Sequence, residues 1–460
     1  MIKILESDIS KNILYEDWCN SSYKVFSKFK DEDFFSDKVQ HIYFYSGIND
    51  DSVNELQRLL MECSKTILDQ SGVQSSPKPI CVHLNSPGGK LSSTDIFYTI
   101  IQTQRVPLCF IIEKLCASAA TFIQLLSPYR VIIDYSQYMI HDMTGFTFFK
   151  GENIVKSKYT YIHNIIYYKE LLKQRTKLTD SEIKNFLERD ILVDAKYCLK
   201  KGIIDRILKF PKINKPGYYA SVGNLQLNLG SFLKKTNLNH IYIDDRLYDN
   251  YDNKITSEVF SSSIQNTHSI NDLCIALDSI FLMKKNSNIK PIIIHFKPFS
   301  NGLFSNANPI ELVSLNYRLA QIQKRIPIIA FIEGVQFFDT LSTIMMCPIR
   351  IMMKPSIIKS TFSFNDTTFG WKTIDVINNS LFEYNQVIKF YKEFTKLPKT
   401  YYSEIRKKII NLDENDLLKY HVIHLCLNIV KKKIDVKDIM DYLQINSLTG
   451  IKNVKNRNVK

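Results

Sequence analysis

The sequence contains little glycine: 14 of 460 residues, about 3%, where about 7% is usual. A glycine at a turn or beside a motif is therefore more informative here than in an ordinary chain. The sequence also lacks an uncharged apolar run of about 18 residues, the length a membrane-spanning helix needs. Its first ten residues, MIKILESDIS, lack the apolar stretch of a signal peptide. These absences predict a soluble, cytoplasmic protein with no membrane partner.

Cysteine pairs at metal-ligand spacing are missing too. The nine cysteines lie singly in apolar stretches such as PICVH and VPLCF, without CxxC motifs or histidines at ligand spacing, as is typical of reduced core residues. The chain also has no GxxxxGK[ST] phosphate-binding loop and so does not hydrolyse ATP by that route. We expect no metal and no cofactor.

Positive charge is concentrated at the C-terminal end. The net charge is +14, and residues 431–460 alone carry eight Lys/Arg against three Asp. A basic terminus of this kind is typically solvated, so nucleic acid is not among the expected partners. We treat residues 429–460 as a basic tail.

Length and hydrophobic pattern predict an α/β protein of more than one domain, since a domain holds about 150 residues. From Val39 onward, short β-rich runs alternate with apolar series at helical spacing, the first of them over residues 53–67. Such β-α repeats favour a parallel sheet with outer helices. We expect an N-terminal extension over residues 1–38 and a domain over 39–210. PKINKPGYY then indicates a linker, which we place at 211–236.

The second half of the chain repeats the first. RVPLCFIIE matches RIPIIAFIE and SPYRVII matches CPIRIMM, so that Arg105 corresponds to Arg325 and Arg130 to Arg350 with a single offset in the numbering. PICVH also has a counterpart in PIIIH. These matches, all in one order, predict a duplicated domain over residues 237–428.

Three motifs follow one another in the first half: HLNSPGG at 83–89, CASAA at 116–120 and YMIHD at 138–142. A fourth stretch, LERDILVDA, comes after them at 187–195. Over about residues 39–208 this order resembles the proteolytic subunit of the Clp protease, a serine peptidase. The resemblance implies the ClpP/crotonase fold, with β-α-β spiral domains, in tandem here. It also implies peptide or unfolded-protein substrates, an oligomeric ring and a separate ATP-dependent unfoldase.

By this resemblance Ser118 is the nucleophile, His141 the general base and Asp190 the residue that orients the histidine. The chemistry needs these types, because a serine hydroxyl attacks a carbonyl only when a neighbour takes its proton, and imidazole titrates near neutral pH. A carboxylate then holds the ring in the right tautomer. Taken singly, Ser118 could equally cap a helix.

The resemblance also assigns the oxyanion hole to the backbone N–H groups of Gly89 and Ala119. Two such donors stabilise the negative charge of a tetrahedral intermediate, and a glycine lets backbone approach closely. Gly88, Thr144 and Gly145 are the expected substrate-binding residues.

The sequence departs from the family pattern near the serine. Glycines that the family carries before and after it are replaced by Lys114 or Leu115 and by Ala120, and the glycine-rich stretch after the histidine is reduced to TGFTFFKGE. These departures leave a catalytically weak or inactive scaffold open as an alternative. A crotonase-type acyl-CoA enzyme is a third reading, although it would not require this triad. Signal-peptide peptidases share a tandem arrangement but are generally membrane-anchored.

The repeated half lacks the triad. At the offset that relates Arg105 to Arg325, Ser118 falls on Phe338, His141 on Thr361, and the aspartate region near Ile409 and Ile410, while KPFSNG stands where SPGG should recur. None of these residues can perform the chemistry. We therefore expect the second domain to be catalytically inactive and structurally necessary.

Overall fold

The computed structural model describes part of the chain. The described residues are 13–65, 67–68, 74–94, 97, 104–141, 165–210, 239–243, 254–256, 273–275, 277–278, 292–296, 312–323, 328–347, 349–354, 356–359, 373–394, 397–404, 411–420, 422–423 and 425–428. The expected linker at 211–236 and the basic tail at 429–460 lie outside this set.

The chain divides into two compact units. The first comprises Met1–Lys209, Asp252–Phe260 and Asn365–Gln386; the second comprises Phe210–Tyr251, Ser261–Phe364 and Val387–Lys460. The first unit therefore includes two segments from the second half of the sequence. No local pattern in the sequence indicated this.

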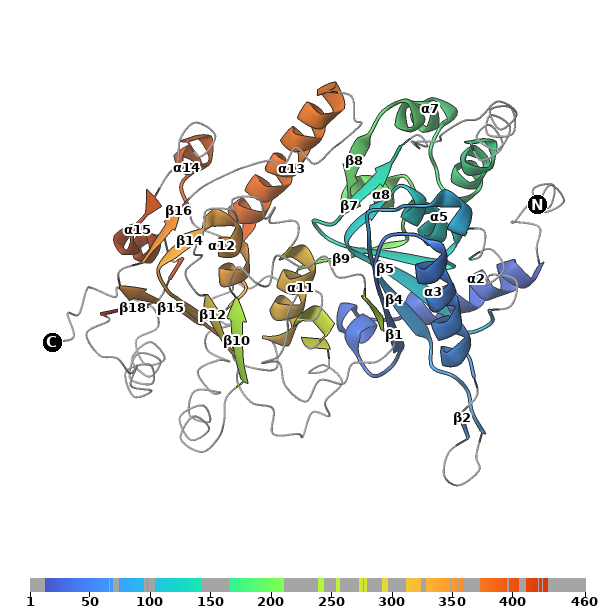
Figure 1. Ribbon diagram of the computed structural model, residues 1–460, viewed down its shortest axis with the longest axis horizontal. Coiled ribbons are helices and arrows are strands. Elements are labelled where there is room, and N and C mark those ends of the chain that lie inside the picture. Colours follow the sequence, from blue (N-terminus) through green and yellow to red (C-terminus); the bar gives the residue numbers. More distant parts are fainter. Residues whose placement is uncertain are drawn as a thin grey trace. The chain divides into compact units, whose positions relative to one another are not determined.

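The first unit contains a sheet in the order β11-β1-β4-β5-β6-β9 (Figure 1). All neighbours are parallel except β11, which lies antiparallel to β1. The bounds are β1 Gln40–Tyr45, β4 Ile80–Ser86, β5 Leu108–Ala117, β6 Tyr129–Ile133, β9 Arg206–Leu208 and β11 Lys254–Thr256. β7 (Gln137–Ile140) pairs with the end of β5, and β8 (Ile191–Asp194) pairs with β7. The expected α/β fold with a parallel sheet is confirmed for this unit.

Helices connect these strands, and their ends follow local capping chemistry. α3 (Asp50–Cys63) begins at Asn49, whose side chain accepts from the N–H of Ser52. A capping box precedes α7 (Asp180–Glu188), with Thr179 and Glu182 bonding each other's backbone N–H. α5 (Ala119–Leu126) and α8 (Ala195–Lys200) complete this set. Residues 165–175 are also helical, and a short antiparallel pair joins β2 (Ile67–Leu68) to β3 (Gln74–Ser75).

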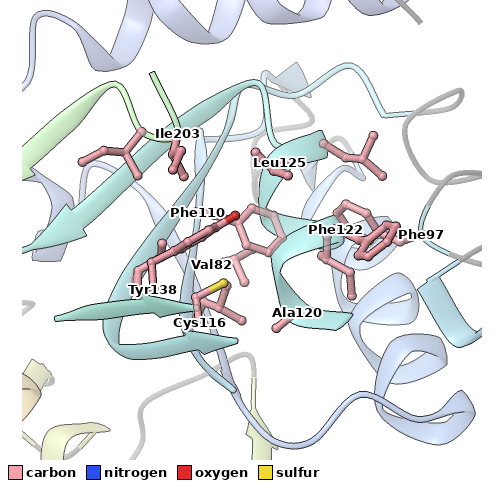
Figure 2. Packing of buried hydrophobic residues seen from close by; sticks show 14 of the residues in the cluster. Val82, Phe97, Phe110, Cys116, Ala120, Phe122, Leu125, Tyr138 and Ile203 are labelled. Carbon is pink, nitrogen blue, oxygen red and sulfur yellow. The ribbon is translucent and has the colours of Figure 1, made fainter. Parts of the chain in front are cut away.

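The core of the first unit lies where the sheet meets these helices. The sequence of β5 is largely apolar, and nearly all of its side chains are buried, as expected for a parallel strand covered on both faces. Figure 2 shows buried side chains of β4, β5 and β7 packed with those of α5 and with Phe97 and Ile203; those labelled are Val82, Phe97, Phe110, Cys116, Ala120, Phe122, Leu125, Tyr138 and Ile203. This packing fixes the end of β5 against the start of α5.

Residues near the N-terminus belong to the same core. α2 (Ile13–Phe26) buries Trp18, whose Nε1 donates to the carbonyl of Val106 at 2.7 Å. Tyr15 donates to the carbonyl of Leu126 at 2.9 Å. Residues 13–26, expected in an extension, are thus an integral part of the first unit.

A buried polar cluster lies within the sheet. His83 Nδ1 lies 2.6 Å from Glu113 Oε1, and both side chains are fully buried. Tyr45 donates to the other carboxylate oxygen of Glu113, and His41 Nδ1 lies 2.9 Å from His83 Nε2. Buried ionisable groups persist only when they are paired and hydrogen-bonded, and this cluster satisfies that condition.

The second unit contains a parallel sheet in the order β10-β12-β13-β15-β18 and a three-stranded sheet, β14-β16-β17. The strand bounds are β10 Asn239–Ile243, β12 Ile292–Phe296, β13 Ile328–Ile332, β14 Val335–Phe337, β15 Ile349–Lys354, β16 Ile357–Lys359, β17 Asn411–Leu412 and β18 Leu425–Asn428. The helices are α11 Val313–Ile322, α12 Phe338–Met345, α14 Lys399–Glu404 and α15 Glu414–Lys419. α13 (Thr373–Phe394) begins in the first unit and ends in the second.

Strand positions in the two units follow the sequence repeat. β5 begins at Leu108 and β13 at Ile328, while β6 begins at Tyr129 and β15 at Ile349. Both pairs of strands are thus related by the same offset as the repeated motifs.

The counterparts of two polar positions and of Ser118 are described in the second unit. His295 on β12 lies 3.9 Å from Glu333, and these residues correspond to His83 and Glu113 in the matched motifs. Phe338, the expected counterpart of Ser118, is the first residue of α12. The other expected counterparts, Thr361, Ile409 and Ile410, lie outside the described residues.

Two general properties concern the described residues as a whole. Among their helices, none combines the length and the apolar character required to cross a bilayer. The eight cysteines whose side chains the structure describes are free thiols, and six of them are buried.

Candidate active site

Three strand ends meet at one edge of the first unit. β5 runs parallel to β7 through the pair Ala117–Met139, and β7 runs antiparallel to β8 through the pair Ile140–Ile191. Ser118 follows β5 directly, His141 follows β7, and Asp190 precedes β8. Strand pairing therefore brings together three residues that are far apart in the sequence.

His141 and Asp190 face each other across the β7–β8 pair. The Nδ1 atom of His141 lies 3.4 Å from Oδ1 of Asp190, and the side chains are only 10% and 14% exposed. This separation is that of an ion pair rather than of a short hydrogen bond. A carboxylate at Nδ1 favours the neutral tautomer with its proton on that atom, in which the lone pair lies on Nε2.

Ser118 has a backbone conformation that serine seldom adopts. Its φ is 54° and its ψ is −128°, a region that costs a non-glycine residue about 1–3 kcal/mol. The turn is held by a hydrogen bond from the N–H of Ser118 to the carbonyl of Met139 at 3.1 Å. Ser118 occupies the N-cap position of α5, yet its side chain makes no capping hydrogen bond. The helix-capping alternative for this hydroxyl is therefore not supported.

The NSPGG turn lies directly against Ser118. Gly88 has a φ of 93°, and a Cβ added there would lie 2.5 Å from the Cβ of Ser118 and 2.6 Å from the carbonyl oxygen of Ala117. Gly89, with a φ of 146°, contacts Ile48 in the same way, since an added Cβ would lie 2.3 Å from the Ile48 carbonyl oxygen. Only residues without a side chain fit both places.

Ala119 is the first residue of α5, and its N–H belongs to the helix turn whose donors have no partner within the helix. Its nitrogen would lie 2.9 Å from a Cβ on Gly88. The start of α5 and the glycine turn are therefore in direct contact. Helix N-termini favour negative charge, so this place suits a developing anion.

A competing nucleophile lies two residues before the serine. Cys116 is fully buried, and burial together with the neighbouring Cys198 raises the pKa of its thiol well above the usual value. Only a thiolate attacks efficiently, so Cys116 acts as a core residue. Within the described part of the chain, no group of three or more potential ligands could hold a metal ion.

Two expected substrate-binding residues, Thr144 and Gly145, lie outside the described residues. Conversely, the structure adds a residue that sequence reasoning did not find. Asn379 of α13 bonds the backbone on both sides of Ile191, at Asp190 and at Leu192. An asparagine 189 positions after Asp190 in a long polar helix carries no local signal of this contact.

Comparison with known proteins finds similarity to Clp proteases over part of the chain. Residues 32–210 match the Clp protease family model. The ATP-dependent Clp protease proteolytic subunit 3 of Synechococcus sp. is 28% identical over 182 residues, which is 38% of this chain and 84% of the relative. The ATP-dependent Clp protease proteolytic subunit of Pleurastrum terricola is 24% identical over 168 residues, 36% and 82% of the two chains.

A solved structure, a ClpP1 mutant from Listeria monocytogenes, is similar over 37% of this chain and 91% of its own, at 18% identity and a TM-score of 0.31. The family match is the more informative finding, because it spans the three strand ends and the glycine turn. The chain is a ClpP-like protein, and its similarity to the Clp protease family covers residues 32–210.

Proposed function

We propose that the first unit is a serine endopeptidase that acts through Ser118, His141 and Asp190. The observation that carries this proposal is the strained turn at Ser118, where the hydroxyl makes no capping hydrogen bond. Ser118 follows β5, and β5 pairs with β7, the strand that His141 follows. Backbone strain concentrates at functional sites. A serine on a sharp strand-to-helix turn is also the arrangement that exposes a nucleophile.

The proposed reaction has two steps. Oγ of Ser118 bonds to the peptide carbonyl carbon while Nε2 of His141 takes its proton and passes it to the leaving amine as the C–N bond breaks. Water then attacks the acyl carbon while Nε2 of His141 takes one of its protons, and the Oγ–C bond breaks as His141 passes that proton to Oγ of Ser118. Asp190 holds the imidazole and stabilises its positive charge.

The developing oxyanion would be bound by the N–H groups of Gly89 and Ala119. Support comes from the contact between the glycine turn and the start of α5. Each such donor is worth roughly 10²–10³ in rate. Gly88 would let the substrate strand approach, and Thr144 and Gly145 stay predictions as further substrate-binding residues.

A serine-directed phosphonate is expected to label the chain once, at Ser118, and Ser118→Ala is expected to abolish that labelling. Mass spectrometry of the intact protein and of its peptides measures this. Ser92→Ala, at an exposed serine just after the glycine turn, is the matched control and should label like the wild type. Labelling that survives Ser118→Ala would disprove the assignment, and a folded wild type that takes no label would favour the inactive scaffold.

We further propose that the second half is a degenerate ClpP-like domain that serves assembly. The repeated motifs and the matching strand positions support this. Related folds assemble in closed symmetric rings, and a ring of tandem chains would alternate active and inactive domains. The relatives are named ATP-dependent, so a separate unfoldase would supply energy for folded substrates.

Such a ring predicts an even number of ClpP-like domains in each layer, because whole tandem chains contribute two domains each. Native mass spectrometry of the purified protein is expected to give a particle of several chains, each of 53.6 kDa. A stable monomer, or soluble active protein after deletion of residues 237–460, would rule out the structural role of the second half.

A further inference from the structure

The strand that begins beside Asp190 has one edge that is not paired with β7. In an antiparallel pair, the backbone groups of residues i and i+2 point to the same side. The carbonyl of Asp190 and the N–H of Leu192 share such a side, and the side chain of Asn379 bonds both. The edge of β8 nearest the aspartate is therefore closed by a side chain rather than by another strand.

The contact of Asn379 is a two-point clamp. Its Nδ2 donates to the carbonyl oxygen of Asp190 at 2.6 Å, and its Oδ1 accepts from the N–H of Leu192 at 3.1 Å. Asn379 is only 5% exposed. A planar amide with one donor and one acceptor reproduces what a neighbouring strand would offer, so the clamp specifies both the position and the direction of the backbone at Asp190.

The same face of α13 packs against all three strands of the site. Phe382 contacts a cluster formed by Ala117, Met139 and Leu192, which lie next to or two residues from the triad positions. Gln386 Nε2 lies 3.4 Å from Oδ2 of Asp194 at the end of β8. Residues 379, 382 and 386 have i, i+3, i+7 spacing and so share one helix face. All of them fall within the first unit.

We infer that Asn379 is a positioning residue for the catalytic carboxylate, supplied from the second half of the chain. The inference rests on the proposed peptidase function. Asp190 lies in the short connection between α7, which ends at Glu188, and β8, which begins at Ile191. Pairing with β7 fixes only one edge of β8. Asn379 fixes the other edge at the point where the carboxylate of Asp190 must meet His141.

Loss of the clamp should affect turnover more than substrate binding. Asn379→Ala removes both hydrogen bonds, whereas Asn379→Asp keeps an acceptor for Leu192 but sets a carboxylate against the carbonyl of Asp190. Both are expected to lower kcat for a fluorogenic peptide by a factor of roughly 10–100 with little change in KM, because misplacement of a catalytic group by about 1 Å costs up to 10²-fold. Gln386→Ala, on the same helix face, is the matched control and should leave kcat within twofold of the wild type.

A double-mutant cycle separates positioning from a merely structural role. If Asn379 acts through Asp190, then Asn379→Ala should reduce kcat little further in an Asp190→Asn background. Hydrogen exchange at the Leu192 amide provides a measurement independent of activity: it should be slow in the wild type and faster in Asn379→Ala.

Some results would overturn this inference but leave the proposed function intact. One is an Asn379→Ala variant with unchanged kcat, and another is a double mutant in which the two reductions of kcat multiply fully. An unprotected Leu192 amide in the wild type would overturn it as well. A wild type with a protected Leu192 amide that neither cleaves peptide nor takes the phosphonate label would instead overturn the proposed function, and the positioning role with it.

Discussion

Ser118→Ala and His141→Ala should each lower kcat for peptide hydrolysis by a factor of roughly 10⁴–10⁶, the largest effects expected anywhere in this chain. The first substitution removes the attacking oxygen, and the second removes the acceptor of its proton. Because both residues act in one step, the double variant should be little slower than either single variant. Steady-state kinetics with a fluorogenic peptide measures all three rates.

Asp190→Asn extends this series, because it keeps the shape of the side chain but loses the charge that faces Nδ1 of His141. Asp190→Asn should lower kcat severely, but by a smaller factor than Ser118→Ala does. Losses from Ser118→Ala and His141→Ala that multiply in the double variant would contradict a shared site. Folding of each variant is verified by circular dichroism, so that loss of structure is not mistaken for loss of chemistry.

Gly88→Ala is expected to abolish Ser118 labelling and to lower activity by more than about 10³, because it displaces the proposed Gly89 donor, worth roughly 10²–10³ by itself, together with the turn that contacts Ser118. A Cβ at this place would lie 2.5 Å from the Cβ of Ser118 and 2.6 Å from the carbonyl oxygen of Ala117, and the φ of 93° disfavours any other residue. The turn must then move away from Ser118. Phosphonate labelling rates and peptide turnover measure the effect.

Gly47→Ala provides the control for this substitution. A Cβ on Gly47 would meet only the carbonyl oxygen of Gly88, at an ordinary contact distance of 3.5 Å. It should therefore leave labelling within a fewfold of the wild type. If Gly88→Ala labelled as fast as Gly47→Ala, the glycine turn could not be part of the site.

Much of the first unit could be predicted from sequence, because its signals are local. The pattern Thr179-x-x-Glu182 is a recognisable capping box at the start of α7. Gly202, with a φ of 63°, follows α8 as glycine commonly follows a helix end. Apolar runs marked the strands of the parallel sheet. One helix end was wrong: the apolar spacing ran to Ile67, whereas α3 ends at Cys63 and Ile67 lies in β2. Periodicity alone does not show that the helix ends before Ser64.

The contacts that pattern reasoning missed are those between residues far apart in the chain. β11 and Asn379 join the first unit from the segments Asp252–Phe260 and Asn365–Gln386, both well beyond Lys209. Neither stretch carries a motif, and an asparagine that bonds backbone is indistinguishable in sequence from one that faces solvent. The sequence likewise did not show which residues bond the buried His83 and Glu113. Which parallel strands lie next to each other depends on the topology of the sheet, not on the spacing of residues in the sequence.

The first unit is built from three separate segments of the chain, so these segments become available one after another during synthesis. Its first segment ends at Lys209 and its last at Gln386, so everything between them must be added before the unit has all its parts. At about 5–20 residues per second this takes roughly 10–35 s. Throughout that interval Ser118 and His141 already exist on the nascent chain while the segment that clamps Asp190 does not. On the proposed function, full proteolytic activity would then be reached only after residue 386 has been synthesised, which would limit cleavage of neighbouring nascent chains.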